Sequence, residues 1–199
     1  SISFLRNIDG MVEKTFIESD LVFAFPEHWG VREYDNHRFY KNISGLGLKG
    51  VDFLLVDPSG AGHLYLMEVK NYRTRVREGI VYEAPLKSPE ELAATIAMKY
   101  EHTLRAIRAV HLYYQRKWWY RLLNRVIRKS QYTQYDSVFW TQAYELARQP
   151  SQHTFLLWLE TETEDQAYEQ QLQNSMGLQI AFKIGRQIHP YPPGIIVQG

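Results

Sequence analysis

Two short hydrophobic runs, 51–56 and 63–69, flank a turn rich in proline and glycine. Both runs are rich in Val, Leu, Phe and Tyr, the residue types that favour strands. A turn of several residues between two such runs predicts a β-hairpin. Positions early in the first strand of an antiparallel hairpin lie level with positions late in the second. The pattern therefore predicts that Asp52 lies level with Glu68, and that Lys70 shares the face of Glu68.

Hydrophobic spacing also predicts the elements before the hairpin. Apolar residues recur at helical spacing from Phe4 to Asp20, which predicts a first helix that contains Glu13. The segment Leu21–Phe25 fits a short strand or a helix end, and His37–Ile43 alternates as a strand does. The predicted order is therefore a helix, a strand and then the hairpin.

A long helix is predicted after the hairpin. Ser88, Pro89 and Glu91 form a capping box with proline at the first helical position, and helical spacing continues to about His111. With the run that follows, this makes a helical, basic segment of about 89–130. The remaining predicted elements are a buried strand at His153–Leu159, a helix at Thr161–Gln173 and a last strand at Leu178–Ile184.

Length and composition narrow the class of protein. A chain of 199 residues suits a single domain spanning 1–199. The sequence contains no Cys, which excludes disulfides, zinc–thiolate sites and thiol catalysis, and which fits a reducing cytoplasm. No run of 18 apolar residues and no basic segment followed by an apolar run occurs. We therefore expect a soluble cytoplasmic protein with no membrane partner.

The distribution of charge is more informative than the net charge of +1. Nine Lys or Arg and one acid, Glu101, lie between Lys99 and Lys129. Within this segment one helix face carries Arg121, Arg125 and Arg128, which suits phosphate contacts, and the other is aromatic and apolar. The aromatic face, Trp118–Ile127, fits packing or a homodimer interface. The basic face is a candidate nucleic-acid surface.

Two carboxylates and a lysine at one end of a hairpin form a candidate catalytic group. Asp52 and Glu68 would be oxygen ligands of a hard cation such as Mg²⁺ or Mn²⁺, which takes its other ligands from water and phosphate. Lys70 would orient or deprotonate a water and offset charge on phosphorus. The reaction expected of such a group of residues is phosphodiester hydrolysis. The alternative is a structural salt bridge, because charges within an apolar strand need partners.

Gly50-Val51-Asp52, followed across a hairpin by Glu68-Val69-Lys70-Asn71, resembles the motif of the PD-(D/E)xK nuclease superfamily. The flanking residues are similar to those of Holliday-junction-resolvase-like enzymes and nuclease-related (NERD) domains. Val51 stands where the family usually has proline, and the glutamine common early in the NERD helix is absent. The resemblance implies a restriction-endonuclease-like αβββαβ core: a mixed central sheet flanked by helices, here with a long basic and aromatic helical insertion.

The resemblance also implies roles for further residues. A first-helix glutamate completes the metal site in many members, which points to Glu13, with Glu18 in reserve. The carbonyl of Val69 would be another metal ligand. Independently of the resemblance, Arg73 and Arg75 alternate at strand spacing, which would put them on one face next to the metal site. There they would contact phosphate, together with Asn71 and the basic face of the helix, or they would be the charges that protect an exposed edge strand.

The function expected from these features is a metal-dependent nuclease that hydrolyses phosphodiester bonds, with DNA favoured over RNA. Two alternatives stay open. The first is a catalytically inactive nuclease-fold subunit that binds nucleic acid. The second is a protein-interaction module that docks a partner through the Trp118–Ile127 face. The presence of all three residues Asp52, Glu68 and Lys70 favours the enzyme.

Overall fold

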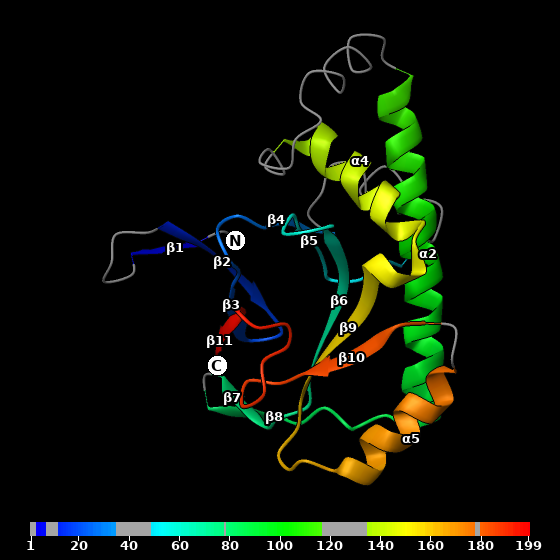
Figure 1. Ribbon diagram of the computed structural model, residues 1–199. Coiled ribbons are helices and arrows are strands. Elements are labelled where there is room, and N and C mark those ends of the chain that lie inside the picture. The colour runs from blue at the N-terminus through cyan, green and yellow to red at the C-terminus, as the bar shows by residue number, and fades with distance from the viewer. Residues whose placement is uncertain (1–2, 7–11, 35–48, 78, 117–134, 178–179) are drawn as a thin grey trace. The chain divides into compact units, whose positions relative to one another are not determined.

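The computed structural model describes residues 3–6, 12–34, 49–77, 79–116, 135–177 and 180–199. The described chain is a mixed α/β protein with three α-helices, a five-stranded mixed sheet and two smaller sheets (Figure 1). Three predictions lie outside the described residues: the strand at 37–43, the arginines Arg121, Arg125 and Arg128, and the Trp118–Ile127 face.

The five-stranded sheet has the order β10-β9-β6-β5-β4. Its strands are β4 (Gly30–Glu33), β5 (Phe53–Asp57), β6 (His63–Asn71), β9 (His153–Glu160) and β10 (Phe182–Gly185). Strands β5 and β6 pair antiparallel, which confirms the predicted hairpin. Strand β9 is buried along its whole length, which confirms the predicted buried strand.

The predicted first helix is wrong. Residues Ser3–Arg6 and Val12–Glu18 form strands β1 and β2, which pair antiparallel. Strand β2 is rich in β-branched and aromatic residues, and it buries Phe16 while leaving Ile17 48% exposed. The strand alternation therefore prevails over a helical spacing that the same apolar residues also satisfy.

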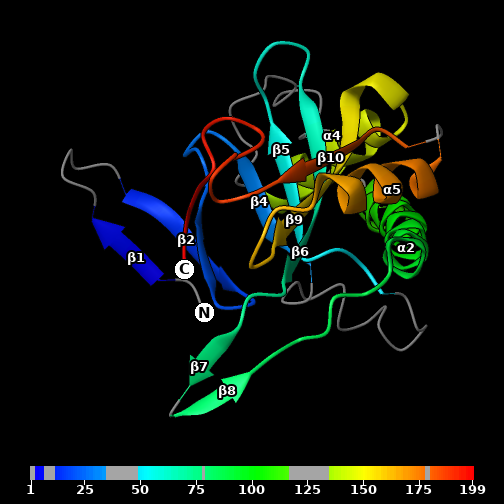
Figure 2. The same cartoon turned by 90° about the horizontal axis from the view of Figure 1, so that it is seen from below.

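Two smaller sheets complete the strands. Strand β3 (Leu21–Ala24) pairs with β2 and with β11 (Ile196–Gln198), which makes a four-stranded sheet of order β1-β2-β3-β11. Residues Leu21–Ala24 thus form a strand, one of the two open alternatives. Strands β7 (Arg75–Arg77) and β8 (Ile80–Tyr82) form a separate two-stranded ribbon (Figure 2).

The three described helices are α2 (Pro89–Gln115), α4 (Asp136–Ala147) and α5 (Gln166–Met176). The predicted capping box of α2 is present, because the Glu91 N–H donates to the Ser88 hydroxyl at 3.2 Å and the Ser88 N–H donates to the Glu91 carboxylate at 3.3 Å. Helix α2 includes the predicted stretch to His111 and continues to Gln115, and residues 117–130 of the predicted helical segment lie outside the described residues. Helix α5 begins later than predicted, because the Asp165 carboxylate caps it by accepting from the Tyr168 N–H at 3.0 Å.

Contacts within the chain define two compact units, and the expectation of one domain over 1–199 stays a prediction. The first compact unit comprises Ser1–Glu27, Glu68–Ile96 and Leu156–Gly199, and the second comprises His28–Met67 and Ala97–Phe155. In the first unit, Phe23 packs edge-on against Trp158 with ring centroids 5.4 Å apart. In the second unit, Phe53 and Phe139 are fully buried. Within the described chain, no helix is long and apolar enough to cross a membrane.

Candidate functional site

The hairpin pattern predicted Asp52 inside the first strand. In the structure it lies at a bend immediately before β5. Its backbone carbonyl accepts from the Tyr34 N–H at 2.9 Å. Its side chain is 15% exposed, and Oδ1 lies 3.9 Å from Nζ of Lys99 on α2. Asp52 is therefore a largely buried carboxylate held beside a helical lysine, all within the second unit.

Two neighbours fix the chain that leads into Asp52. A Cβ on Gly50 would lie 2.0 Å from the ring of Tyr34, so only glycine fits at this position. The Val51 N–H donates to Oγ1 of Thr103 at 3.2 Å, and the same hydroxyl donates to the Lys99 carbonyl at 2.7 Å. The approach to Asp52 is thus tied to the turn of α2 that carries Lys99.

Glu68 and Lys70 form the second ion pair, in the first unit. Glu68 lies on β6 with its side chain 1% exposed, and its Oε1 lies 2.5 Å from Nζ of Lys70, whose side chain is 26% exposed. The Lys70 ammonium also donates to the Val69 carbonyl at 3.3 Å. The lysine thus contacts both oxygens that the resemblance assigns to the metal on this strand.

The hairpin register leads to both carboxylates. Phe53 pairs with Met67, and Asp52 and Glu68 are the next residues beyond that pair on the two arms of the hairpin. No group of three or more Asp, Glu, His or Cys side chains suited to a metal occurs among the described residues. Only the backbone of Glu13 belongs to that described part, so this result does not include its side chain.

Glu13 and Glu18 do not lie on a helix. Both lie on strand β2, where Glu13 pairs with Leu5 in the register. The Glu18 carboxylate accepts from the neighbouring Ser19 hydroxyl at 3.0 Å. The prediction that a first-helix glutamate completes the metal site is therefore wrong about the helix, because both residues lie on a strand. A metal-ligand role for either residue stays a prediction.

Arg73 makes contacts within the first unit. Its guanidinium lies 2.8 Å from Oε2 of Glu160, whose side chain is 1% exposed. It also donates to Oε1 of Gln187 at 3.2 Å. The other Glu160 oxygen accepts from the Trp158 ring N–H at 3.0 Å. Arg73 is therefore the counter-ion of a buried carboxylate, a contact that no local sequence pattern reveals.

Asn71 and Arg75 reach the turn between β2 and β3. The Asn71 side chain donates to the Ser19 carbonyl at 2.9 Å, and the Arg75 guanidinium lies 2.6 Å from the Asp20 carboxylate. Ser19 and Asp20 both have positive φ, so these contacts fasten a strained turn. A phosphate contact by Asn71, Arg73 or Arg75 stays a prediction, and each side chain has a structural partner as well.

Lys99 is a site residue that the sequence reasoning did not assign. The sequence does contain a signal for Lys99, because it falls at helical spacing on the same stripe as Ile96, Thr103 and Ile107. The structure shows that these three residues are fully buried. A lysine on a buried helical stripe needs an anionic partner. In the structure that partner is Asp52.

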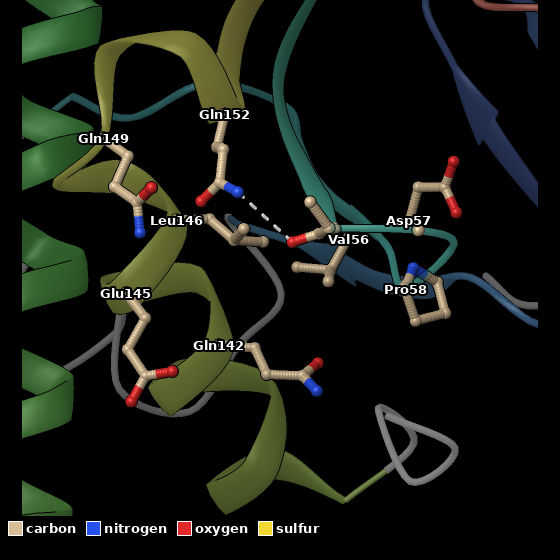
Figure 3. Close-up of a pocket in the computed structure, with 11 residues that line it drawn as sticks. Val56, Asp57, Pro58, Gln142, Glu145, Leu146, Gln149 and Gln152 are labelled. Atoms are coloured by element: carbon tan, nitrogen blue, oxygen red, sulfur yellow. Dashed lines mark hydrogen bonds between the residues drawn. The ribbon is translucent and has the colours of Figure 1, made fainter. Parts of the chain in front are cut away.

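A pocket of about 280 Å³ lies in the second unit, between the β5–β6 turn and the end of α4 (Figure 3). Figure 3 shows Gln142 and Glu145 projecting from α4, with Asp57, the last residue of β5, across from them. The Gln152 side chain, which follows α4, donates to the Ala61 carbonyl at 3.3 Å. The lining residues, all within the described part, include two carboxylates and no Lys, Arg or His. This pocket therefore disfavours a phosphate ligand.

The geometry defines a mixed α/β protein with two largely buried lysine–carboxylate pairs, one in each compact unit. No protein-family model, no curated protein and no solved structure matches the chain.

Proposed function

We propose that this protein is a metal-dependent nuclease that hydrolyses DNA phosphodiester bonds, with Asp52 and Glu68 as ligands of Mg²⁺ or Mn²⁺. One observation carries the proposal. The side chain of Glu68 is only 1% exposed, on the central strand β6. Phe53 of β5 pairs with Met67 of β6, and Asp52 and Glu68 are the residues that come next to this pair in the sequence. Burying an ion pair costs several kcal/mol per ion before the attraction is counted, and apolar replacements are often at least as stable. Two such carboxylates at the end of one hairpin fit a catalytic role.

The donor atoms fit a hard divalent cation. Carboxylate oxygens of Asp52 and Glu68 and the carbonyl oxygen of Val69 are the ligand types that Mg²⁺ prefers, with water and phosphate completing the set. A bound cation would supply an acidic water and would neutralise charge on the phosphate.

The lysines would act on the substrate side. Nζ of Lys70 holds a proton beside Glu68 and the Val69 carbonyl. With Glu68 engaged as a metal ligand, the Lys70 ammonium would be free to donate to the attacking water or to a phosphate oxygen. Lys99 stands in the same relation to Asp52, 3.9 Å from its carboxylate. Without metal, each lysine would thus offset the charge of its carboxylate. With metal bound, it would offset the charge of the phosphate.

The order of elements supports a restriction-endonuclease-like core. Strands β4, β5 and β6 follow one another and are neighbours in the sheet. The β7–β8 ribbon and then helix α2 come next, and β9, which follows α4, lies beside β6. This succession corresponds to the βββαβ part of the αβββαβ core that the resemblance implies. The described chain before β4 forms strands where that core has a helix, which is the main departure.

Cleavage assays test the proposal. Supercoiled plasmid and short duplexes incubated with Mg²⁺ or Mn²⁺ should be cut by the wild type, and EDTA should stop cleavage. Asp52→Asn and Glu68→Gln should abolish it, because each removes a negatively charged metal ligand. Asp57→Asn, at the opposite end of β5, is the matched control and should cleave normally. Wild-type activity in both Asp52→Asn and Glu68→Gln would require withdrawal of the nuclease assignment.

One observation favours a second candidate, a nuclease-fold subunit that binds nucleic acid without cutting it. Each carboxylate already has a lysine partner, Glu68 with Lys70 and Asp52 with Lys99. Two such neutral pairs can persist in the absence of a cation. DNA binding by a wild type that cuts no substrate with any divalent ion would select this candidate.

A further inference from the structure

A second pocket of the second unit lies between α2 and α4 and has a volume of about 430 Å³. Its chemistry differs from that of the pocket at the β5–β6 turn. The lining residues are Leu104, Ile107 and Arg108 from α2, and Tyr144, Ala147 and Arg148 from α4 and its end. The pocket thus combines an apolar wall, one aromatic ring and two guanidinium groups.

The two arginines are exposed and have no carboxylate partner within the described chain. Other arginines of the same unit do have one. A guanidinium nitrogen of Arg105 lies 3.2 Å from Oε2 of Glu101, and Nε of Arg32 lies 2.8 Å from Oδ1 of Asp136. Arg108 and Arg148 therefore give this pocket a positive charge that the neighbouring carboxylates do not cancel.

The tyrosine ring is held in place from one side. His111 stacks on Tyr144 with ring centroids 4.1 Å apart and planes 9° from parallel. The guanidinium carbon of Arg148 lies 5.7 Å from the centroid of the same tyrosine ring. Because His111 is only 7% exposed, the stack is anchored in the core of the unit. The pocket wall therefore offers a fixed aromatic surface beside a guanidinium group, the two kinds of group on which nucleobases stack.

We propose that this pocket binds a nucleotide, with its phosphate between Arg108 and Arg148 and its base against Tyr144 and the apolar wall. Guanidinium groups match phosphate oxygens with paired hydrogen bonds. Nucleobases stack on aromatic rings and guanidinium planes. The volume lies within the range of roughly 300–1,000 Å³ that is usual for small-molecule sites. A free phosphate would use only the arginines and would leave the wall unoccupied.

This site is separate from the proposed metal ligands. Arg108 follows Lys99 by nine positions on α2, which is about two and a half turns of helix. The two side chains therefore leave the helix on opposite faces, and Lys99 faces Asp52. Nucleotide binding here does not depend on the nuclease proposal.

The test is calorimetric titration of the whole chain with AMP, adenosine and inorganic phosphate, all in EDTA. AMP should bind the wild type, and adenosine and phosphate should each bind more weakly. Arg108→Gln and Arg148→Gln should each weaken AMP about tenfold, the effect of losing one charge-assisted hydrogen bond. Arg105→Gln, on the same helix but paired with Glu101, is the control and should change the affinity by less than about twofold.

Several results would overturn the inference. They are absence of AMP binding to the wild type, equal affinity for phosphate and AMP, and equal weakening by the Arg105→Gln control. Thermal melts of each variant establish that it is folded. A second variant, Arg148→Lys, should keep part of the affinity, because it keeps the charge and loses the planar fork. Asp52→Asn should still bind AMP, so a failure of the nuclease proposal and a failure of this one give different results.

Discussion

The Lys70 ammonium nitrogen lies 2.5 Å from Oε1 of Glu68, a carboxylate whose side chain is 1% exposed on strand β6. This pair can be a permanent structural salt bridge or the metal-free state of a catalytic site. The two possibilities differ in what happens when the lysine is removed and a divalent ion is added.

Removal of Lys70 should first be visible in stability. Lys70→Ala leaves a buried carboxylate without its cation, so the free energy of unfolding should fall by about 3 kcal/mol. If Glu68 is a metal ligand, millimolar Mg²⁺ should restore much of that loss, because the ion replaces the lysine charge. The measurement is denaturant unfolding with Mg²⁺ and with EDTA.

The double variant Glu68→Gln with Lys70→Ala is the control for that experiment. It lacks the buried charge, so it should be more stable than Lys70→Ala and should not respond to Mg²⁺. A Mg²⁺ response equal to that of Lys70→Ala would place the ion elsewhere. No response in either variant would identify the pair as structural.

Gly50 positions Asp52, and its replacement should be costly. In Gly50→Ala the new Cβ would lie 2.0 Å from the buried ring of Tyr34, so we expect a loss of about 3 kcal/mol from overpacking. The control is Gly60→Ala, where φ is +59° but no atom lies within 4 Å, so only about 1 kcal/mol of backbone strain is expected. Thermal or chemical denaturation distinguishes the two. A Gly50→Ala loss no larger than that of Gly60→Ala would contradict the close packing of Gly50 on Tyr34.

Stability should fall in acid because of His111. Burial lowers the pKa of His111 below its ordinary value of 6.5. As the pH falls below 6.5, the unfolded chain therefore takes up a proton that the folded His111 still excludes, and the free energy of unfolding decreases until the folded pKa is reached.

His111→Phe tests that pH dependence. Phenylalanine keeps the stack on Tyr144 and removes the titrating group, so the drop in Tm from about pH 7.5 to about pH 5 should become smaller. The pKa of His63 is also lowered, by burial and by the charge of His153, against an opposing effect of Asp57, so part of the drop should persist. His189→Phe, at a side chain that is 78% exposed, is the control. An unchanged drop in His111→Phe would contradict the prediction.

Arg73 separates structural from DNA-binding roles. Arg73→Ala leaves the buried Glu160 without its counter-ion and should lower the free energy of unfolding by about 3 kcal/mol. The double variant with Glu160→Gln should recover much of that loss. If Arg73 also contacts phosphate, the double variant should still bind DNA more weakly than Glu160→Gln alone, which a salt-dependent binding assay measures. Equal affinity would assign Arg73 to structure only.

Elements with a local signal were predictable. The hairpin follows from two β-rich runs and the turn between them, and the start of α2 follows from Ser88 and Glu91, which are three residues apart and bond to each other. The first helix fails because Phe16 and Ile17 satisfy both periods, and pairing of β2 with β1 and β3 decides between them. Helix α4 was not predicted, although it buries Val138, Phe139, Ala143 and Leu146 on one side.

The partners of the candidate site were predictable only where the spacing is short. Glu68 and Lys70 are two residues apart on one strand, and alternation alone places them on one face. Asp52 and Lys99, like Arg73 and Glu160, come from distant parts of the chain, and tertiary packing brings them together. A sequence pattern can show that such a charge needs a partner, but it does not show which residue that partner is.

The central claim is that one divalent ion is held by Asp52 and Glu68. A crystal structure of the protein soaked with Mn²⁺, with anomalous data, tests it most directly. The account predicts a Mn²⁺ peak at roughly 2.0 to 2.6 Å from a carboxylate oxygen of each residue, with Lys70 released from Glu68. A structure in which no ion binds, and in which Glu68 stays with Lys70 and Asp52 with Lys99 at saturating Mn²⁺, would contradict it.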